Sequence, residues 1–589
     1  MKRFALLLLV VFVNAAPVPQ VIRGVVVADD GSVLPGVTVT LDGRDAVVTD
    51  AQGRFLFPAA AAGTHTVVAE LAGYRGVAQS LTLPAGTALD IRLTLKPAAV
   101  AETIVVTAEA PLLQVNAAGS GRTKRGDSAY YAPILEHDWK TAARERVTTF
   151  SIDVDGASYA NVRRFLETNE PPPADAVRLE EMVNYFRYHY PEPADGRPIA
   201  ISTEVAGCPW APEHRLLRIG IRGRTADQWR LAPNNLVFLL DVSGSMSPPD
   251  RLPLIQQALR LLVDRLRGDD TVSIVVYAGA AGVVLPKTSV ANKDVILAAL
   301  DKLEAGGSTA GGEGIELAYK IAEENFDPHA NNRVILATDG DFNVGASSIK
   351  ELETLIESKR RRGLYLTCIG VGDDNLNDGM MEMLAGKGNG NYYYLDSLDE
   401  AKKVFGRELT STLVAVADDV KVQLEFDPGA IQSYRQLGYE DRALANEDFA
   451  DDSKDAGEIG SGQSVTALYE LVPNAGAGRG RIAALRVRYK DPGAAASKEL
   501  TAAIVDDGKS AFDATPDTQW AAAIAEMSML LRDSPHKGRS SWADVAALAR
   551  ATRGEDVDGL RGELLGMVEK ARNAGVPPAG AQASRLRSR

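Results

Sequence analysis

Two short apolar runs, each leading to an aspartate, constrain the fold of this chain most strongly. Residues 236–240 and 334–337 are unbroken apolar runs bounded by turn residues, as the buried strands of a parallel sheet are. Asp241 follows the first run, and Asp339 closes the second. In an open parallel sheet covered by helices on both faces, ligands collect beyond the carboxyl ends of the strands. The sequence therefore predicts that both aspartates lie at a ligand-binding edge of an α/β sheet.

Three hydroxyl residues are expected to join these aspartates. Ser243 and Ser245 lie two and four residues after Asp241 in a glycine-containing loop, so their alternate side chains can point to one place. Thr309 follows the glycines at 306–307, which would allow its loop to approach closely. The alternative is that these residue types simply cap the helices that follow them. Capping alone does not explain all five positions in this strand context.

The five side chains supply only oxygen, which suits a hard divalent cation. Two carboxylates and three hydroxyls favour Mg²⁺, or Mn²⁺ or Ca²⁺, over zinc or copper. Magnesium prefers about six oxygen ligands and usually keeps some waters, so a coordination position is expected to remain open. We expect an Asp or Glu carboxylate from a partner protein to fill it.

The motif D-x-S-x-S, followed by a threonine and then by an aspartate on a later strand, resembles the metal-ion-dependent adhesion site of the von Willebrand factor type A (vWA) domain. The resemblance covers residues 234–415, where the order of the expected strands and helices also agrees. It implies a central, doubly wound, Rossmann-like α/β domain. It also implies that the three hydroxyls contact the ion directly, while the two aspartates hold the ion or its waters.

The first residues of the chain have the pattern of a secretory signal peptide. Lys2 and Arg3 precede an apolar core from Phe4 to Val13, and small residues follow. This core is shorter than the roughly 20 residues that a membrane-spanning helix needs. We therefore expect residues 1–16 to be a cleavable signal and the protein to reach the periplasm, the outer membrane or the cell surface. An uncleaved anchor is the alternative.

Residues 20–97 alternate apolar and polar positions in short runs separated by turn signals, which predicts a small β-sandwich. Runs such as TDAQGRFLF resemble the carboxypeptidase regulatory-like domain, a transthyretin-like fold. Either a spacer role or a partner-binding role would fit it. Residues 98–145 are expected to form a linker, within which residues 101–113 resemble the segment before the plug of TonB-dependent receptors. That segment would be either linker or a strand that pairs with an outer-membrane or TonB-linked partner.

Two regions flank the vWA-like domain, at residues 146–233 and 416–580. Both resemble the flanking regions of a bacterial envelope family that carries a central vWA domain. Alternation in runs such as SVTALYEL predicts that the second region is an α+β domain rich in strands. Residues 440–458 hold eight acidic side chains, for which a solvated loop is favoured over an ion- or partner-binding face. Residues 581–589 are expected to be a disordered tail.

Composition excludes several classes of function. The formal net charge of −14 argues against binding to nucleic acid. The six histidines show no paired spacing for zinc, Ser243 lacks a nucleophile-elbow pattern, and GGSTAGG lacks the lysine of a phosphate-binding loop. We therefore expect no enzyme, but a metal-dependent adhesion or scaffold protein of the bacterial cell envelope. An envelope assembly or maturation factor and a metal-dependent hydrolase are the alternatives.

Overall fold

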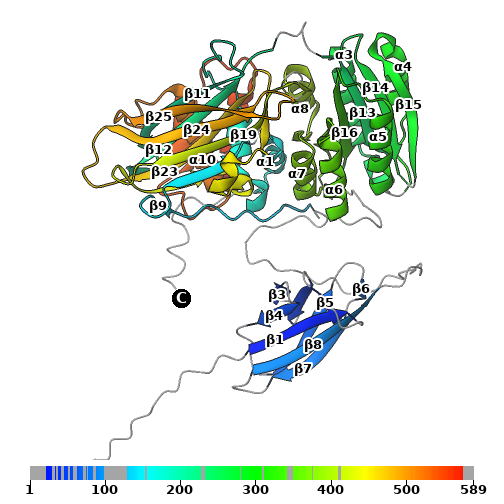
Figure 1. The fold of residues 1–589 in the computed structure, drawn as a ribbon, viewed down its shortest axis with the longest axis horizontal. Coiled ribbons are helices and arrows are strands. Elements are labelled where there is room, and N and C mark those ends of the chain that lie inside the picture. The colour runs from blue at the N-terminus through cyan, green and yellow to red at the C-terminus, as the bar shows by residue number, and fades with distance from the viewer. Residues whose placement is uncertain are drawn as a thin grey trace, which may run out of the picture. The chain divides into compact units, whose positions relative to one another are not determined.

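The computed structural model describes residues 21–97 and 129–574, apart from short stretches within these ranges. The omitted stretches are 29–32, 35–36, 42–44, 51–52, 58–62, 71–73, 76, 84–87, 153–154, 227–231, 279, 308–310, 341–348, 374–375, 409–410 and 412. Four features predicted from sequence lie outside the described residues: the signal at 1–16, the segment at 101–113, Thr309 and the tail at 581–589. The chain divides into two compact units, Met1–Ala118 and Gly119–Arg589 (Figure 1).

The first unit is the predicted β-sandwich, which is confirmed. Its two four-stranded sheets have the orders β4-β1-β8-β6 and β3-β2-β5-β7. Alternate residues of these strands, such as Val39, Phe55 and Leu93, form one apolar core. The strands are β1 (Val21–Ala28), β2 (Thr38–Leu41), β3 (Asp45–Val48), β4 (Arg54–Phe57), β5 (Gly63–Glu70), β6 (Tyr74–Arg75), β7 (Val77–Leu83) and β8 (Ala88–Pro97).

The second unit contains the predicted α/β domain, whose six-stranded sheet has the order β15-β14-β13-β16-β17-β18. All neighbouring strands are parallel except β14 and β15. The strands are β13 (Asn234–Asp241), β14 (Thr271–Tyr277), β15 (Ala281–Ser289), β16 (Asn331–Thr338), β17 (Leu364–Gly370) and β18 (Tyr392–Tyr394). The helices are α3 (Leu252–Arg265), α4 (Lys293–Asp301), α5 (Gly311–Glu324), α6 (Ile349–Arg360), α7 (Asp378–Lys387) and α8 (Leu398–Ala401), which continues as a π-helix over Lys402–Arg407.

Helices cover both faces of this sheet because its central strands are apolar on both sides. Along β13, Leu236, Phe238 and Leu240 pack with residues of α3 and α4. Val237 and Leu239 point to the other face, where they pack with residues of α5, α6 and α7. Figure 1 shows these helices around the green strands of the sheet. Such an arrangement leaves the two ends of the strands as the places where a site can open.

Two antiparallel sheets, which we call the flanking sandwich, pack beside the α/β domain. Their orders are β21-β10-β19-β24-β25, with β22 added on β19, and β11-β12-β23-β20-β9. The strands before the α/β domain are β9 (Lys140–Thr141), β10 (Val147–Ser151), β11 (Ile199–Cys208) and β12 (Ala211–Gly223). Those after it are β19 (Ala415–Phe426), β20 (Ile431–Leu437), β21 (Ala443–Leu444), β22 (Gly457–Gly460), β23 (Ser464–Pro473), β24 (Gly480–Lys490) and β25 (Ser497–Asp506).

Each sheet of the flanking sandwich contains strands from both sides of the α/β domain, a feature that the sequence did not predict. Phe150 of β10 is opposite Val422 of β19, and Ile219 of β12 is opposite Ala467 of β23. The regions at 146–233 and 416–580, expected as two separate regions, therefore form one body into which the α/β domain is inserted. Alternation along the sequence identifies a strand but not its distant partner.

A layer of helices shares an apolar core with the flanking sandwich. This core includes Tyr159, Phe186 and Trp520, all buried. The helices are α1 (Ala157–Glu167), α2 (Leu179–Asn184), α10 (Pro516–Leu531), α11 (Trp542–Thr552) and α12 (Leu560–Asn573). Among the described residues, no helix is both long enough and apolar enough to cross a membrane.

Candidate metal centre

Three of the five predicted ligands lie together at the end of β13. The strand ends at Asp241, whose Oδ1 accepts a hydrogen bond from the backbone N–H of Ser243 (2.9 Å). The hydroxyl oxygens of Ser243 and Ser245 are 3.0 Å apart. Asp241 and Ser243 are almost completely buried, whereas Ser245 is half-buried. The spacing of the motif therefore gathers one carboxylate and two hydroxyls around one point.

Asp339 lies on the neighbouring strand at the same edge of the sheet. It directly follows β16, which runs parallel to β13 with Leu240 opposite Ala337, and its side chain is fully buried. Thr338, which was not predicted as a site residue, donates its hydroxyl proton to Asp241 Oδ2 (3.0 Å). The two aspartates are thus brought to one edge of the sheet, as predicted.

Burial at this edge disfavours the ionised form of Asp241. Burial raises the pKa of the Asp241 carboxyl, and the negative charge of Asp339 contributes to the same shift. Hydrogen bonds from Ser243 and Thr338 act in the opposite direction. A bound cation would stabilise the ionised carboxylates that burial disfavours.

An arginine that sequence analysis missed also reaches the site. Arg251 Nη1 lies 2.7 Å from Asp339 Oδ2 and donates a hydrogen bond to the carbonyl oxygen of Ser245 (2.9 Å). Its side chain is only 5% exposed. Gly372, with φ of 77°, provides space, because a Cβ atom there would lie 2.6 Å from Arg251 Nε. One of the two buried carboxylates therefore already has a cationic partner.

The loop that leads to Thr309 approaches the serine loop, as its glycines predicted. Gly244 N–H donates to the carbonyl oxygen of Gly307 (3.0 Å), and Gly306 N–H donates to that of Val242 (2.7 Å). Gly307 has φ of 86°, a conformation that favours glycine. Thr309 itself lies outside the described residues, so its part in the site stays a prediction.

Capping of a helix does not account for the described side chains of this site. The helix α3 begins at Leu252, and its N-cap residue is Arg251, so neither Asp241 nor Ser243 caps it. Ser243 precedes a short 3-10 helix but makes no capping hydrogen bond with its side chain. Within the described part of the chain, no group of three or more His, Cys, Asp or Glu side chains could hold a metal ion. A cation at this edge would therefore depend on the serine hydroxyls together with the two carboxylates.

Comparison with known sequences identifies every large part of the chain. The profile of the von Willebrand factor type A domain matches residues 235–407, and a profile described as von Willebrand factor matches residues 125–218. The carboxypeptidase regulatory-like domain matches residues 21–96, and the C-terminal region of uncharacterized protein YfbK matches residues 411–574. Uncharacterized protein YfbK of Escherichia coli (strain K12) is 41% identical over 469 residues, which are 75% of this chain and 81% of that protein.

This chain belongs to the YfbK family. The predicted vWA domain with family-specific flanking regions and the carboxypeptidase regulatory-like domain are confirmed. Uncharacterized protein sll0103 of Synechocystis is 28% identical over 302 residues, covering 49% of this chain and 68% of that protein. The solved structure of a von Willebrand factor type A protein from Catenulispora acidiphila is 16% identical, with a TM-score of 0.39, and covers 64% of this chain and 91% of that one.

Proposed function

We propose that this YfbK-family protein binds other proteins in the bacterial cell envelope through a divalent cation in its vWA domain. The cation would be Mg²⁺, or Mn²⁺ or Ca²⁺, held by the five residues that the sequence predicts, Asp241, Ser243, Ser245, Thr309 and Asp339. The observation that carries this proposal is the pair of serine hydroxyls, 3.0 Å apart, beside a buried aspartate at the carboxyl edge of the sheet. Hydroxyl and carboxylate oxygens are the ligands that hard cations prefer.

The charge of the site supports an acidic partner. Asp241 and Asp339 carry two negative charges when ionised, and Arg251 offsets one of them. A divalent cation would then leave the site with a net positive charge, since hydroxyl ligands are neutral. A carboxylate from a partner's Asp or Glu would neutralise that charge and complete the coordination.

Localisation in the envelope rests on the amino-terminal sequence. A signal peptide at residues 1–16 would export the protein to the periplasm or the cell surface. Residues 101–113 would offer a segment for an outer-membrane or TonB-linked partner. In this proposal the chain is a recognition protein and not an enzyme.

Calorimetric titration of the purified protein with Mg²⁺ and with Mn²⁺ tests the site. Replacing Ser243 by alanine removes a hydroxyl that would contact the ion, so we expect metal affinity to fall by about tenfold or more. Ser247→Ala is the matched control, because this exposed hydroxyl lies in the same loop and donates to the carbonyl oxygen of Gly244. An unchanged titration in Ser243→Ala would contradict the metal site.

Partner binding requires a separate measurement. Crosslinked capture from envelope extracts, in Mg²⁺ and in chelator, should recover proteins that depend on the cation and that Ser243→Ala no longer retains. Capture that is equal in chelator and in Mg²⁺ would contradict a cation-dependent interaction even if the metal binds.

A further inference from the structure

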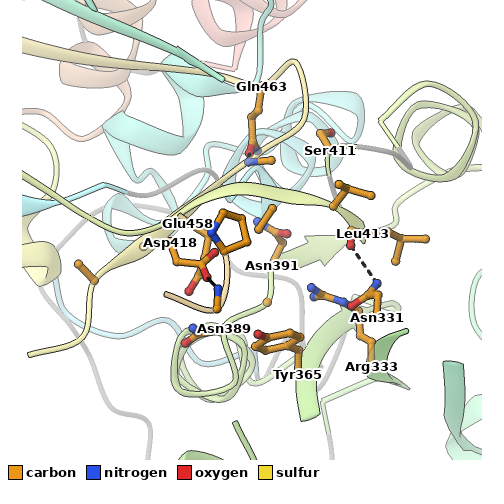
Figure 2. Close-up of a pocket in the computed structure, with 18 of the residues that line it drawn as sticks. Asn331, Arg333, Tyr365, Asn389, Asn391, Ser411, Leu413, Asp418, Glu458 and Gln463 are labelled. Carbon is orange, nitrogen blue, oxygen red and sulfur yellow. Dashed lines mark hydrogen bonds between the residues drawn. The ribbon is translucent and has the colours of Figure 1, made fainter. Parts of the chain in front are cut away.

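A second candidate site lies at the opposite end of the vWA sheet, where the vWA domain meets the flanking sandwich. A cavity of about 550 Å³ opens there (Figure 2). Arg333 and Tyr365 line it from the first residues of β16 and β17, whereas Asp339 follows the last residue of β16. The flanking sandwich contributes Asp418 of β19 and Glu458 of β22. The cavity is therefore separate from the candidate metal centre.

The cavity wall carries a buried arginine, Arg333. Arg333 is only 6% exposed, and its guanidinium carbon lies 5.5 Å from the centre of the Tyr365 ring. Its Nη1 donates a hydrogen bond to Thr367 Oγ1 (2.8 Å), but its Nε has no hydrogen-bond partner among the described residues. Within that same part of the chain, no Asp or Glu forms an ion pair with it. Burial accordingly lowers the pKa of Arg333.

Carboxylates gather on the other side of the same cavity. Figure 2 shows Asp418 and Glu458 side by side, across the cavity from Arg333. The Oε1 atom of Glu458 is buried and has no hydrogen-bond partner in the described structure. Burial raises the pKa of Glu458 well above its usual value, and the charges of Asp455 and Asp418 add to this shift. Asp455 already has a partner in Arg360, and Asp418 accepts a hydrogen bond from Gly493 N–H (3.1 Å).

The two sides of the cavity therefore carry acidic and basic groups that form no ion pair with each other among the described residues, although Arg333 and Glu458 each shift the other's pKa toward the charged form. A buried charge without a partner is costly, and a buried polar atom without a hydrogen bond is costly as well. Asn389 adds one more such atom, because its Oδ1 is buried and has no partner among the described residues. Figure 2 shows Asn389 beside Tyr365 and below the carboxylates, and Asn391 also lines the cavity. A ligand with a single charge would satisfy only one side.

We propose that this cavity binds a zwitterionic ligand of the amino-acid or short-peptide class, with its carboxylate on Arg333 and its ammonium group on Glu458 and Asp418. The planar guanidinium suits a carboxylate, since it can donate parallel hydrogen bonds. The asparagine amides would bind the peptide groups between the two charged ends. The volume lies in the usual range for small-ligand sites, roughly 300 to 1,000 Å³.

Calorimetry with the full-length protein and three alanine peptides tests this proposal. Trialanine carries both charges, N-acetyl-trialanine keeps only the carboxylate, and trialanine amide keeps only the ammonium group. We expect saturable binding of trialanine and about tenfold or more weaker binding of each blocked peptide, because each has lost a charge-assisted contact. Equal affinity for the three peptides, or no saturable binding of trialanine at millimolar concentration, would overturn the proposal.

Two variants test which side chain of the cavity contacts each charged end of the peptide. Arg333→Met should remove the preference for a free carboxylate and keep the preference for a free ammonium group. Glu458→Gln should have the reverse effect, and this isosteric change keeps the test decisive if Arg333→Met does not fold. Glu425→Gln is the matched control, because this glutamate of β19 lies outside the cavity and pairs with Arg146 (2.7 Å). A loss of both preferences in either folded variant would contradict the assignment.

The metal centre and the cavity can be tested independently. Trialanine should bind equally well in Mg²⁺ and in chelator, because the two sites lie at opposite ends of the sheet. Failure of the metal titration would thus leave the peptide result unaffected, and failure of the peptide titration would leave the metal result unaffected. An affinity for trialanine that disappears in chelator would place the peptide at the metal centre and would overturn this inference.

Discussion

At the scale of single residues, the ion pair between Arg251 and Asp339 sets the charge of the candidate metal centre. Replacing Arg251 by glutamine removes the guanidinium from a fully buried carboxylate, so the free energy of unfolding in chelator should fall by about 3 kcal/mol. Mg²⁺ should restore part of this loss and should bind more tightly than to the wild type, since a cation can replace the missing charge. Urea denaturation in chelator and in Mg²⁺ measures both effects.

The control for this prediction lies on α3, the helix that begins directly after Arg251. Arg260 of α3 pairs with Asp301, but both side chains are substantially exposed, at 37% and 56%. Arg260→Gln should therefore change stability by less than about 1 kcal/mol, with or without Mg²⁺. If Arg251→Gln lost the same stability in chelator and in Mg²⁺, the guanidinium and the metal would not share one site.

The same ion pair shows how far single residues could be predicted from sequence. The position of Ser243 relative to Ser245 was predictable, because both lie in one loop and their spacing determines where their side chains point. Arg251 was not predictable, because it reaches Asp339 only through the packing of α3 beside Gly372, far away in the sequence. Local patterns identify candidate ligands, but the charges that modulate them come from tertiary packing.

At the scale of elements, α10 carries a carboxyl group that should make stability depend on pH. Glu526 is 1% exposed in the middle of this buried helix, and burial raises its pKa to about 7, although Ser540 donates a hydrogen bond to it (2.9 Å). Because the folded-state pKa exceeds the unfolded one, the folded protein binds more protons and loses stability as pH rises from about 4.5 to 7. The loss from this group should reach about 3 kcal/mol above pH 7.

Glu526→Gln should remove this dependence and make the protein more stable than the wild type at pH 8, while the two converge near pH 5. Chemical denaturation at both pH values measures the difference. Glu569→Gln, at an exposed position on α12 paired with Arg550 (3.0 Å), should leave the pH profile unchanged. If the free energy of unfolding depended on pH with the same slope in the wild type and in Glu526→Gln, Glu526 would not titrate in this range.

Elements with a clear apolar period were predictable, and those without one were not. The run SVTALYEL, whose alternation predicts a strand, lies in β23. The acidic stretch at 440–458 has no such period, and a solvated loop was favoured there. The structure instead places its last residues in β22, which pairs with β19 through Ala417 and Ile459. That distant pairing, invisible in the local pattern, is what brings Glu458 into the cavity.

At the scale of the second unit, buried ion pairs join the inserted vWA domain to its flanking layers. Arg178, next to α2, forms ion pairs with Asp378 at the start of α7 and with Glu181, and it lies 3.3 Å from Glu382. Arg163 of α1 makes a similar bridge to Asp396 (2.6 Å). The vWA domain is therefore connected to the rest of the unit by charges that are satisfied only when the two parts are docked.

Arg178→Met should consequently destabilise the vWA domain and the flanking sandwich together. Removal of the guanidinium leaves the carboxylates of Glu181 and Asp378 buried without it, which should lower the free energy of unfolding by about 3 to 5 kcal/mol. Arg146→Gln is the control, because its pair with Glu425 is exposed on both sides and should contribute less than about 1 kcal/mol. Hydrogen exchange followed by mass spectrometry measures β13 and β23 separately. Both strands should lose protection to the same extent, since their docking is shared, and a loss confined to one of them would mean that the two parts unfold independently.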